Sequence, residues 1–278
     1  MRFTKMQGLG NDYIYINSLE KAVADPSALA RKMSDRHFGV GADGIVLIGR
    51  EGEDFTMRMF NADGSEAEMC GNAARCVGKY IRDKGLSDRD EIRLWTGAGM
   101  KILQLSVKDG ETVSVRVDMG EPILVPEKIP VNLTGDRAVR VPFEIPGFRG
   151  AMTCVSMGNP HAVFFVEDTE RFDVHGIGSV IETHPLFPRK TNVEFATILS
   201  RKELRMRVWE RGAGETMACG TGACATLVAA VLNGYCERDA VLRLNGGPLR
   251  VTWDAESNRV FQEGPAVFVF DGEFTAQG

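Results

Sequence analysis

One stretch of the sequence occurs twice, and the two copies restrict the fold more than any other feature. The first copy runs from Phe60 to Cys70 and continues with Gly-Asn, and the second runs from Trp209 to Cys219 and continues with Gly-Thr. Each copy begins with an aromatic residue, passes through a small and acidic loop to Cys-Gly, and leads into helix-forming residues. The second cysteine therefore follows the first by 149 positions.

Other segments repeat with nearly the same spacing. Asn159 follows Asn11 by 148 positions, and the segment 191–198 follows the segment that begins at Ala42 by 149 positions. A spacing that holds at three places indicates an internal repeat. We therefore predict an α/β protein of two pseudo-symmetric domains, each with the order loop, strand, loop, strand, Cys and helix.

Local signals place several elements within the halves. Asp25 as N-cap and Pro26 in the first position predict a helix over 26–36, and the run after the first Cys-Gly predicts a helix over 72–83. The segment 118–122 and the proline-containing stretch from there to Pro146 are interpreted as the crossing between the halves. The apolar segment 266–270 has no place in the second repeat, and we expect it to pair with the first half. The predicted domains are thus 1–118 plus 264–278, and 119–263.

Composition excludes several classes of function. The formal net charge of −5 argues against a nucleic-acid-binding protein, which usually has a basic face. No run approaches 18 apolar residues, and the N-terminus has no signal-peptide pattern, so we expect neither a membrane segment nor secretion. The six cysteines fit neither a disulfide framework nor a zinc-binding spacing. The sequence therefore predicts a cytoplasmic protein with reduced thiols and no metal.

The two Cys-Gly pairs can carry chemistry because each opens a predicted helix. The amides of the first turn have no partner within the helix, and the helix dipole places positive charge there. This environment stabilises a thiolate, so we expect the pKa of each cysteine to fall toward neutrality. The following amides predict a cradle for a carboxylate, formed by Gly71, Asn72, Gly220 and Thr221.

Two thiols on opposite sides of one carbon suit stereoinversion. One thiolate removes a proton from one face, and the opposite thiol delivers a proton to the other face. The alternative is that a cysteine at a helix start is a small core residue. Two cysteines at matched positions favour catalysis by Cys70 and Cys219, whereas packing is the interpretation for Cys76, Cys154, Cys224 and Cys236.

Polar residues near the repeats have two interpretations each. His161 is either a loop histidine bonded to a backbone carbonyl or a group that tunes the thiols. Asparagines at matched positions either make turns or line a polar pocket, and they are Asn11, Asn61, Asn159 and Asn192. Glu210 and Arg211 are either an exposed charge pair at a strand end or, because they replace Asn61-Ala62 of the first copy, an asymmetry that suits a substrate with two different ends.

Seven motifs occur in one order along the chain: Gly8-Leu-Gly-Asn-Asp12, Asn61-Ala-Asp-Gly-Ser65, Cys70-Gly-Asn72, Gly158-Asn-Pro-His161, Thr191-Asn-Val193, Glu210-Arg-Gly212 and Ala218-Cys-Gly-Thr-Gly222. Together they resemble the diaminopimelate epimerase family over nearly the whole chain. The resemblance implies interconversion of LL-2,6-diaminopimelate and the meso form by two cysteines, without pyridoxal phosphate, metal or any other cofactor. It implies two domains, each a β-barrel-like sheet around a central helix, with the active site in the cleft.

The resemblance also assigns residues. It implies catalysis by Cys70 and Cys219, and tuning of the thiols by His161 and Glu210. The implied contacts to the diamino dicarboxylate are Asn11, Asn61, Gly71, Asn72, Asn159, Asn192, Glu210, Arg211, Gly220 and Thr221. Many members carry a substrate-contacting Gln where this chain has Gly44, which puts that contact in doubt. The family is often dimeric, so a homodimer is left open.

Two other classes of protein remain as alternatives. Proline and hydroxyproline racemases resemble this family in fold and also use paired cysteines, but their first cysteine usually lies in Arg-Cys-Gly-His, whereas Met69-Cys-Gly-Asn occurs here. A non-catalytic amino-acid binder or a thiol redox sensor is the second alternative, because two facing thiols can form a disulfide. Neither needs the matched asparagines.

Overall fold

The internal repeat corresponds to two structural units in the computed structural model, which describes residues 1–275. Unit 1 comprises Met1–Val117 together with the chain from Glu263, and unit 2 comprises Asp118–Gln262. The chain thus passes from unit 1 to unit 2 and back again. Within the described residues, no helix combines the length and the hydropathy needed to cross a bilayer.

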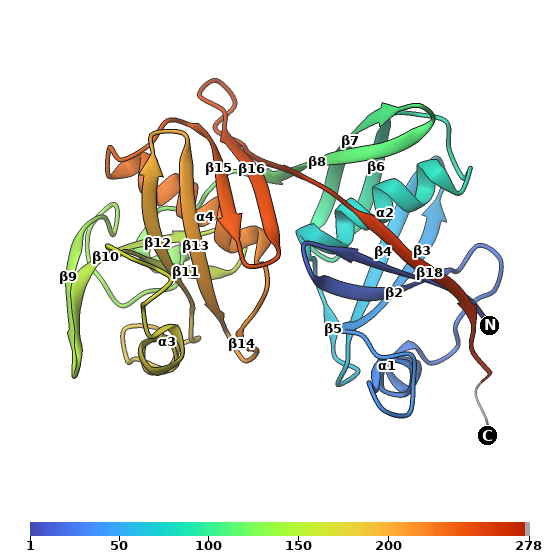
Figure 1. Cartoon of the computed structure of the whole chain (residues 1–278), viewed down its shortest axis with the longest axis horizontal. Coiled ribbons are helices and arrows are strands. Elements are labelled where there is room, and N and C mark those ends of the chain that lie inside the picture. The colour runs from blue at the N-terminus through green and yellow to red at the C-terminus, as the bar shows by residue number, and fades with distance from the viewer. Residues whose placement is uncertain (276–278) are drawn as a thin grey trace. The chain divides into compact units, whose positions relative to one another are not determined.

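Unit 1 is one curved, mixed sheet around a helix (Figure 1). Its neighbouring strands pair in the order β18, β1, β2, β3, β4, β6, β7 and β8, with β2–β3 and β4–β6 parallel and the other pairs antiparallel. The elements are β1 (Arg2–Gly8), β2 (Asn11–Asn17), α1 (Pro26–Ser34), β3 (Gly44–Glu51), β4 (Asp54–Asn61), β5 (Glu66–Ala67), α2 (Gly71–Asp83), β6 (Glu91–Thr96), β7 (Gly99–Lys108), β8 (Glu111–Gly120) and β18 (Val267–Glu273).

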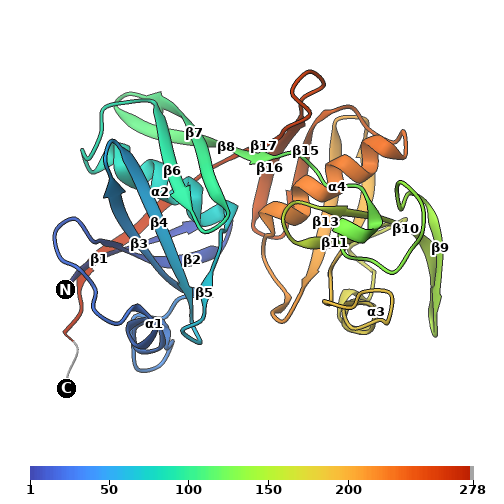
Figure 2. The same ribbon diagram turned by 180° about the vertical axis from the view of Figure 1, so that it is seen from behind.

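Unit 2 repeats this arrangement, as the reverse view shows (Figure 2). Its neighbouring strands pair in the order β9, β10, β11, β12, β13, β15 and β16, with β11–β12 and β13–β15 parallel. The elements are a 3₁₀ turn (Pro126–Lys128), β9 (Val141–Ile145), β10 (Phe148–Ser156), β11 (Pro160–Phe165), α3 (Val174–Glu182), β12 (Asn192–Ser200), β13 (Glu203–Glu210), β14 (Gly214–Glu215), α4 (Gly220–Leu232), β15 (Asp239–Leu244), β16 (Gly247–Trp253) and β17 (Val260–Gly264).

The central helices α2 and α4 are buried on almost every side. A helix enclosed in this way usually carries small or apolar residues all round, and α4 does so with the sequence GTGACATLVAAVL. α2 departs from this pattern, because it also buries Asn72, Arg75 and Lys79. Both helices end in the same manner. Gly85 follows α2 with φ of 74°, and Gly234 follows α4 with φ of 76°. A left-handed residue just after a helix lets the next amide reach back to the last turn, and glycine adopts this conformation without strain.

The predicted helix over 26–36 is confirmed, but it ends two residues earlier. The Asp25 carboxylate accepts the amide of Ala28 at 2.9 Å, as expected of an N-cap. At the other end, the Asp35 carboxylate accepts the amides of His37 and Phe38 at 2.7 and 2.8 Å. These side-chain bonds compete with the helical ones and end α1 at Ser34.

The chain passes from unit 1 to unit 2 at Asp118, but the stretch from there to Pro146 is more than a crossing, because it contains β9. This strand pairs with β10, with Pro142 opposite Ala151. Proline is compatible with an edge strand because its missing N–H can lie on the unpaired side. The strand after the second repeat is β18, and it pairs with β1 of unit 1, as expected. β18 therefore occupies in unit 1 the place that β9 occupies in unit 2.

Strand pairing also corrects the repeat spacing by one residue. Ile45 pairs with Phe60, and the matching pair in unit 2 is Val193 with Trp209. Positions up to β3 and β12 therefore correspond at a spacing of 148, and positions from β4 and β13 onward at 149. Gly44 consequently corresponds to Asn192 in the fold.

Candidate active site

Cys70 lies in a cluster of polar side chains in unit 1. It is the N-cap of α2, which confirms that the first Cys-Gly opens a helix. The Cys70 thiol donates to Asn11 Oδ1 at 3.3 Å, and Asn72 Nδ2 donates to the same oxygen at 3.5 Å. Asn11 Nδ2 in turn donates to Asp43 Oδ2 at 2.7 Å. We call Asn11, Asp43, Cys70 and Asn72 the first thiol cluster.

Asp43 was not predicted from the sequence. It holds the Asn11 amide in one orientation and also accepts from Arg36 at 3.0 Å. Burial raises its pKa, and the bonds it accepts from Asp12 N–H and Asn11 oppose this effect. Because the bond from Asn11 uses the amide N–H, Asn11 Oδ1 is the atom that faces the thiol.

Cys219 has the matching position in unit 2. It is the N-cap of α4, and its Sγ accepts the amide of Gly222 at 3.4 Å. Thr221 Oγ1 lies 3.5 Å from Cys219 Sγ, and Asn159 Nδ2 donates to Thr221 Oγ1 at 3.3 Å. The loop asparagine thus contacts the residue two positions after the cysteine in both units. We call Asn159, His161, Glu194, Glu210, Cys219 and Thr221 the second thiol cluster.

The first interpretation of His161, a loop histidine bonded to a backbone carbonyl, is wrong. His161 lies on β11 and has no exposed surface. Its Nδ1 lies 2.7 Å from Glu194 Oε1, and its Nε2 lies 3.0 Å from Asn159 Oδ1. Both partners are side chains of the second thiol cluster. The role of His161 in tuning a thiol stays a prediction.

Glu210, at the end of β13, lies beside the second thiol. Its carboxylate accepts from Thr216 Oγ1 and from the Cys219 thiol. Burial raises the pKa of Glu210, and these two hydrogen bonds oppose the shift.

The expected fall in the pKa of Cys219 is wrong. Burial raises the pKa of this thiol well above its ordinary value, and the negative charges of Glu210 and Glu194 raise it further. The bonds from Thr221 and from the Gly222 amide act in the expected direction but are weaker than burial. The helix-start argument considered the dipole and omitted the two carboxylates.

The remaining predicted residues occupy different surroundings. Asn61 donates to Ser65 Oγ at 3.0 Å. Asn192 is buried, donates to the Pro160 carbonyl at 2.8 Å and accepts the Arg211 amide at 3.0 Å. The Arg211 guanidinium is exposed and donates to the Arg189 carbonyl at 3.1 Å. Gly71 and Gly220 are the first residues of α2 and α4.

A side chain at Gly220 or at Gly44 would collide with its surroundings. A Cβ on Gly220 would lie 2.7 Å from Gln262 Oε1, so glycine lets the helix start approach that side chain. A Cβ on Gly44 would lie 2.1 Å from the Phe60 carbonyl oxygen. The close packing of β3 against β4 at this point therefore requires glycine at position 44 and leaves no room for Gln.

Burial confirms the packing interpretation of the other cysteines, Cys76, Cys154, Cys224 and Cys236. It raises the pKa of Cys76 to about 11, of Cys154 to about 12 and of Cys236 to about 11. Thiols with such values are poor nucleophiles at neutral pH.

Sequence reasoning missed Glu194, although a signal was present. Glu194 is a charged residue in the otherwise uncharged strand β12, and it has no exposed surface. The strand pairing makes Val46 its counterpart in unit 1. A carboxylate where the other copy has a buried valine indicates a role other than packing.

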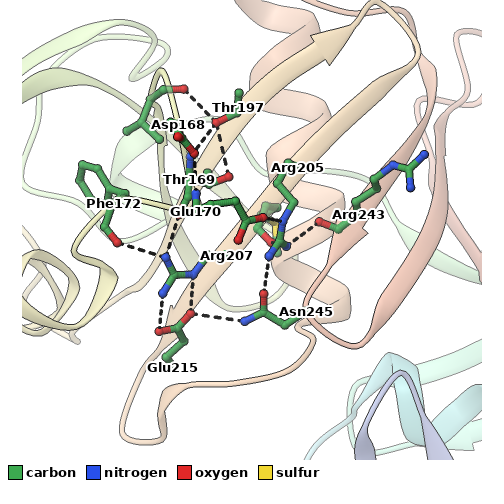
Figure 3. A network of polar contacts seen from close by, with 12 residues as sticks. Asp168, Thr169, Glu170, Phe172, Thr197, Arg205, Arg207, Glu215, Arg243 and Asn245 are labelled. Atoms are coloured by element: carbon green, nitrogen blue, oxygen red, sulfur yellow. Dashed lines mark hydrogen bonds and ion pairs between the residues drawn. The ribbon is translucent and has the colours of Figure 1, made fainter.

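A cavity of about 760 Å³ lies in unit 2 and is separate from these clusters. Figure 3 shows the polar network beside it. Arg205 donates to Glu170, to the carbonyls of Met206 and Arg243, and to Asn245 Oδ1 at 2.6 Å. Arg207 binds both Glu215 oxygens, at 2.7 and 3.0 Å. Both guanidinium groups use their N–H donors on protein acceptors and thereby link neighbouring strands. Few donors are therefore left for a ligand.

Solved structures define the class of protein to which this fold belongs. The phenazine biosynthesis protein of the PhzF family from Bacillus anthracis superposes with a TM-score of 0.72 at 16% identity, covering 99% of each chain. A hydroxyproline epimerase from Agrobacterium vitis superposes with a TM-score of 0.67 at 15% identity, covering 98% of this chain and 90% of the other. At these identities the likeness shows a two-domain fold shared with epimerases and racemases.

Sequence comparison identifies the family within that fold. The model of the diaminopimelate epimerase family matches residues 3–125 and 153–269. Diaminopimelate epimerase from Acetivibrio thermocellus is 58% identical over 98% of each chain, and that from Desulfovibrio desulfuricans is 54% identical over 99% of this chain and 98% of the other. The chain belongs to the diaminopimelate epimerase family, and the resemblance found in its motifs is confirmed.

Proposed function

We propose that the chain interconverts LL- and meso-2,6-diaminopimelate by proton transfer at the α-carbon between Cys70 and Cys219, as a step of lysine biosynthesis. The observation that carries this proposal is that each unit has a cysteine at the start of its central helix. Cys70 contacts the loop residue Asn11 of unit 1, and Cys219 contacts Thr221 of unit 2. Each unit therefore carries one of the two thiols that a two-base epimerisation needs.

The helix starts suit a carboxylate substrate. The first amides of α2 and α4 follow Cys70 and Cys219 directly, and unpaired amides at a helix start attract anions. The α-proton of an amino acid is a very weak acid, so the site must lower the barrier by about 10 kcal/mol or more through charge stabilisation and exclusion of water. Amide donors beside each thiol are suited to the negative charge that develops on the carboxylate.

Selection of the diamino dicarboxylate is assigned to residues that break the repeat. Arg211 corresponds to Ala62, so only unit 2 offers a guanidinium at this position. Asn192 accepts the Arg211 amide and thereby holds the backbone from which this side chain extends. A bidentate contact between Arg211 and the distal carboxylate would select substrates with two amino-acid ends.

Cellular location and assembly belong to the same proposal. An enzyme of amino-acid biosynthesis meets its substrate in the cytoplasm, and the six free thiols suit a reducing compartment. A homodimer is the assembly to test by light scattering, since the family is often dimeric.

Proton exchange tests the function directly. Reduced protein is incubated with pure LL-diaminopimelate in D2O, and both the stereochemistry and the mass of the product are followed. Meso product that carries one deuterium is the expected result. Lack of exchange with every diamino acid would remove the proposal and leave an amino-acid binder or a thiol redox sensor.

A further inference from the structure

Arg75 of α2 is a large and permanently charged side chain that has no exposed surface. A buried guanidinium is costly unless its N–H donors are used. Arg75 Nη2 donates to Asn72 Oδ1 at 2.9 Å, and Arg75 Nε donates to the Pro265 carbonyl at 3.3 Å. Through the first of these bonds, a buried cation acts on a residue of the first thiol cluster.

The bond from Arg75 fixes which end of the Asn72 amide faces which neighbour. A guanidinium has only donors, so the Asn72 atom that it contacts must be the oxygen. The amide nitrogen therefore faces the other way, and Asn72 Nδ2 donates to Asn11 Oδ1 at 3.5 Å. The same oxygen accepts the Cys70 thiol at 3.3 Å. Asn72 thus directs its N–H groups toward the side of the cluster on which the thiol lies.

Gly8, at the end of β1, allows the neighbouring backbone to approach this pair of side chains. A Cβ on Gly8 would lie 3.3 Å from Arg75 Nη2 and 3.1 Å from the backbone oxygen of Asn72. Gly8 is also paired with Asn11 across β1 and β2. The glycine therefore lets the hairpin that carries Asn11 lie against Arg75 and Asn72.

The repeat shows that a central helix forms without a cation at this position. α2 and α4 each have 13 residues and begin directly after the cysteine, so Asn72 corresponds to Thr221 and Arg75 to Cys224. Cys224 is as fully buried as Arg75. A threonine hydroxyl can turn to donate or to accept, whereas an amide has one donor end and one acceptor end. The cation thus occurs in the unit in which an amide has to be oriented.

We propose that Arg75 is a positioning residue, which occupies the Asn72 oxygen and thereby presents the Asn72 N–H groups to a carboxylate at the start of α2. The carboxylate is that of the substrate, so this inference rests on the proposed function. An N–H donor attracts an anion, and an amide oxygen at the same place would repel it. Without Arg75, the Asn72 oxygen loses its charged donor, and the amide can turn that oxygen toward the anion.

Two alkylating reagents measure the preference for a carboxylate at Cys70 without any substrate. Iodoacetate carries a carboxylate next to the reacting carbon, whereas iodoacetamide is neutral. Both are attacked by the same Cys70 thiolate, so the ratio of the two rates does not depend on how much thiolate is present. We expect Arg75→Met to lower the iodoacetate-to-iodoacetamide ratio about tenfold, the effect of one hydrogen bond to a charged group. An unchanged ratio in the folded variant would overturn the proposal.

A double variant separates positioning from direct attraction by the charge. Asn72→Ala removes the amide that Arg75 is proposed to hold. If Arg75 acts through Asn72, Arg75→Met should not lower the ratio further in the Asn72→Ala protein. A buried cation that attracted the anion directly would lower the ratio in both backgrounds. A further drop in the double variant would therefore contradict the positioning role.

Lys79→Met is the matched control for the loss of a buried cation from α2. Lys79 lies four residues after Arg75 and donates to Asp83 at 2.6 Å and to the Thr112 carbonyl at 2.7 Å. Its removal should reduce stability but leave the ratio at Cys70 unchanged. A loss as large as in Arg75→Met would mean that the ratio reports the packing of α2, and would overturn the proposal. Arg75→Lys keeps a cation that has only donors and should retain more of the ratio than Arg75→Met; the reverse order would contradict the proposal.

Titration of the unmodified protein with acetate makes the test independent of the folding of Arg75 variants. The side-chain NH2 signals of nitrogen-15-labelled protein are followed by NMR, and those of Asn72 are assigned by their loss in Asn72→Ala. We expect the Asn72 signals to shift together with the Gly71 amide, because both groups donate to the anion. Asn72 signals that do not move would overturn the proposal.

The kinetic arm distinguishes this proposal from the proposed function. Arg75→Met should raise KM for diaminopimelate about 10-fold and change kcat by no more than about threefold, because the Asn72 amide binds the carboxylate before and during proton transfer. Alkylation and acetate binding need no epimerisation, so a protein that passes both tests but does not epimerise would refute the proposed function alone. An active epimerase whose KM and alkylation ratio are unaffected by Arg75→Met would refute the positioning role alone.

Discussion

The two thiol clusters share a frame and differ in their ionisable groups. In each unit the cysteine caps the central helix, and the loop asparagine contacts the second residue of that helix. The Cys70 thiol donates to the neutral amide of Asn11. Around Cys219 lie two carboxylates and a buried histidine, and Cys219 is only 5% exposed.

This difference separates two requirements of a two-base reaction. The repeated backbone places a thiol and amide donors, and it is the same in both halves. The protonation of each thiol depends on groups that the repeat does not preserve, such as Glu194 opposite Val46 in the alignment of the units. Two acids built on identical frames can therefore hold different protonation states at one pH.

The largest effect is expected from removal of either thiol. Cys70→Ala and Cys219→Ala should each lower epimerisation by about 10³-fold or more, and the double variant should lose little beyond either single one, because the two residues act as a unit. Deuterium incorporation and product stereochemistry measure the loss. Cys76→Ala, on the same helix as the first thiol, is the control and should stay active. Full activity of either catalytic variant would remove the paired mechanism.

Arg211→Lys tests the asymmetry outside the thiols. Lysine keeps the charge but cannot form a bidentate contact, so KM for diaminopimelate should rise by about 10- to 100-fold with a smaller change in kcat. Steady-state kinetics with both isomers measure this change. Ala62, the counterpart in unit 1, should tolerate Ala62→Ser without an increase in KM. An unchanged KM in Arg211→Lys would show that Arg211 does not bind the distal carboxylate.

Gly44→Gln introduces the residue that many family members carry. Because a Cβ there would meet the Phe60 carbonyl at 2.1 Å and Tyr13 Cε1 at 2.9 Å, the variant should be less stable by about 1–3 kcal/mol. Urea unfolding gives the free energy. Asn192→Gln at the corresponding position of unit 2 is the comparison, since that site already accommodates a side chain. A stable and more active Gly44→Gln would show that the two strands adjust readily.

Glu210→Gln tests the electrostatic difference with the smallest expected effect. The negative charge of Glu210 raises the pKa of Cys219, so its removal lowers that pKa. At a pH below the thiol pKa the thiolate fraction then rises, and Cys219 should be alkylated faster at neutral pH. Cys70 in the same sample is the internal reference and should react at an unchanged rate. Slower alkylation of Cys219 would mean that Glu210 stabilises the thiolate through Thr216 or another bond.

The repeated elements of the two units could be predicted from the sequence because their pattern occurs twice. The matched Cys-Gly pairs, the asparagine loops and the helix-ending glycines each have local signatures that do not depend on the rest of the fold. β9 escaped prediction because Pro142 within it and Pro146 directly after it are typical of a linker, and only its pairing with β10 shows that it is a strand. Asp43 and Glu194 escaped because their importance comes from partners distant in sequence.

The pKa of Cys219 could not be predicted for the same reason. A helix start is visible in the sequence, whereas the approach of Glu194 and Glu210 to the thiol depends on how β12 and β13 pass beside α4. The first factor lowers a thiol pKa and the second raises it, together with burial. Local rules thus selected Cys219 as the candidate residue but gave the wrong direction for the shift of its pKa.

The place of β18 at the edge of unit 1 has a consequence for synthesis on the ribosome. Unit 2 is one continuous segment, and all of it has been translated at Gln262. Unit 1 begins with the first residue but still lacks β18 at that point, and the N-terminal amine finally donates to the Phe274 carbonyl at 2.8 Å. Domains generally fold in the order of their synthesis. Here the half that is translated first is completed only after unit 2, and its β1 edge stays open to other strands until β18 has been translated.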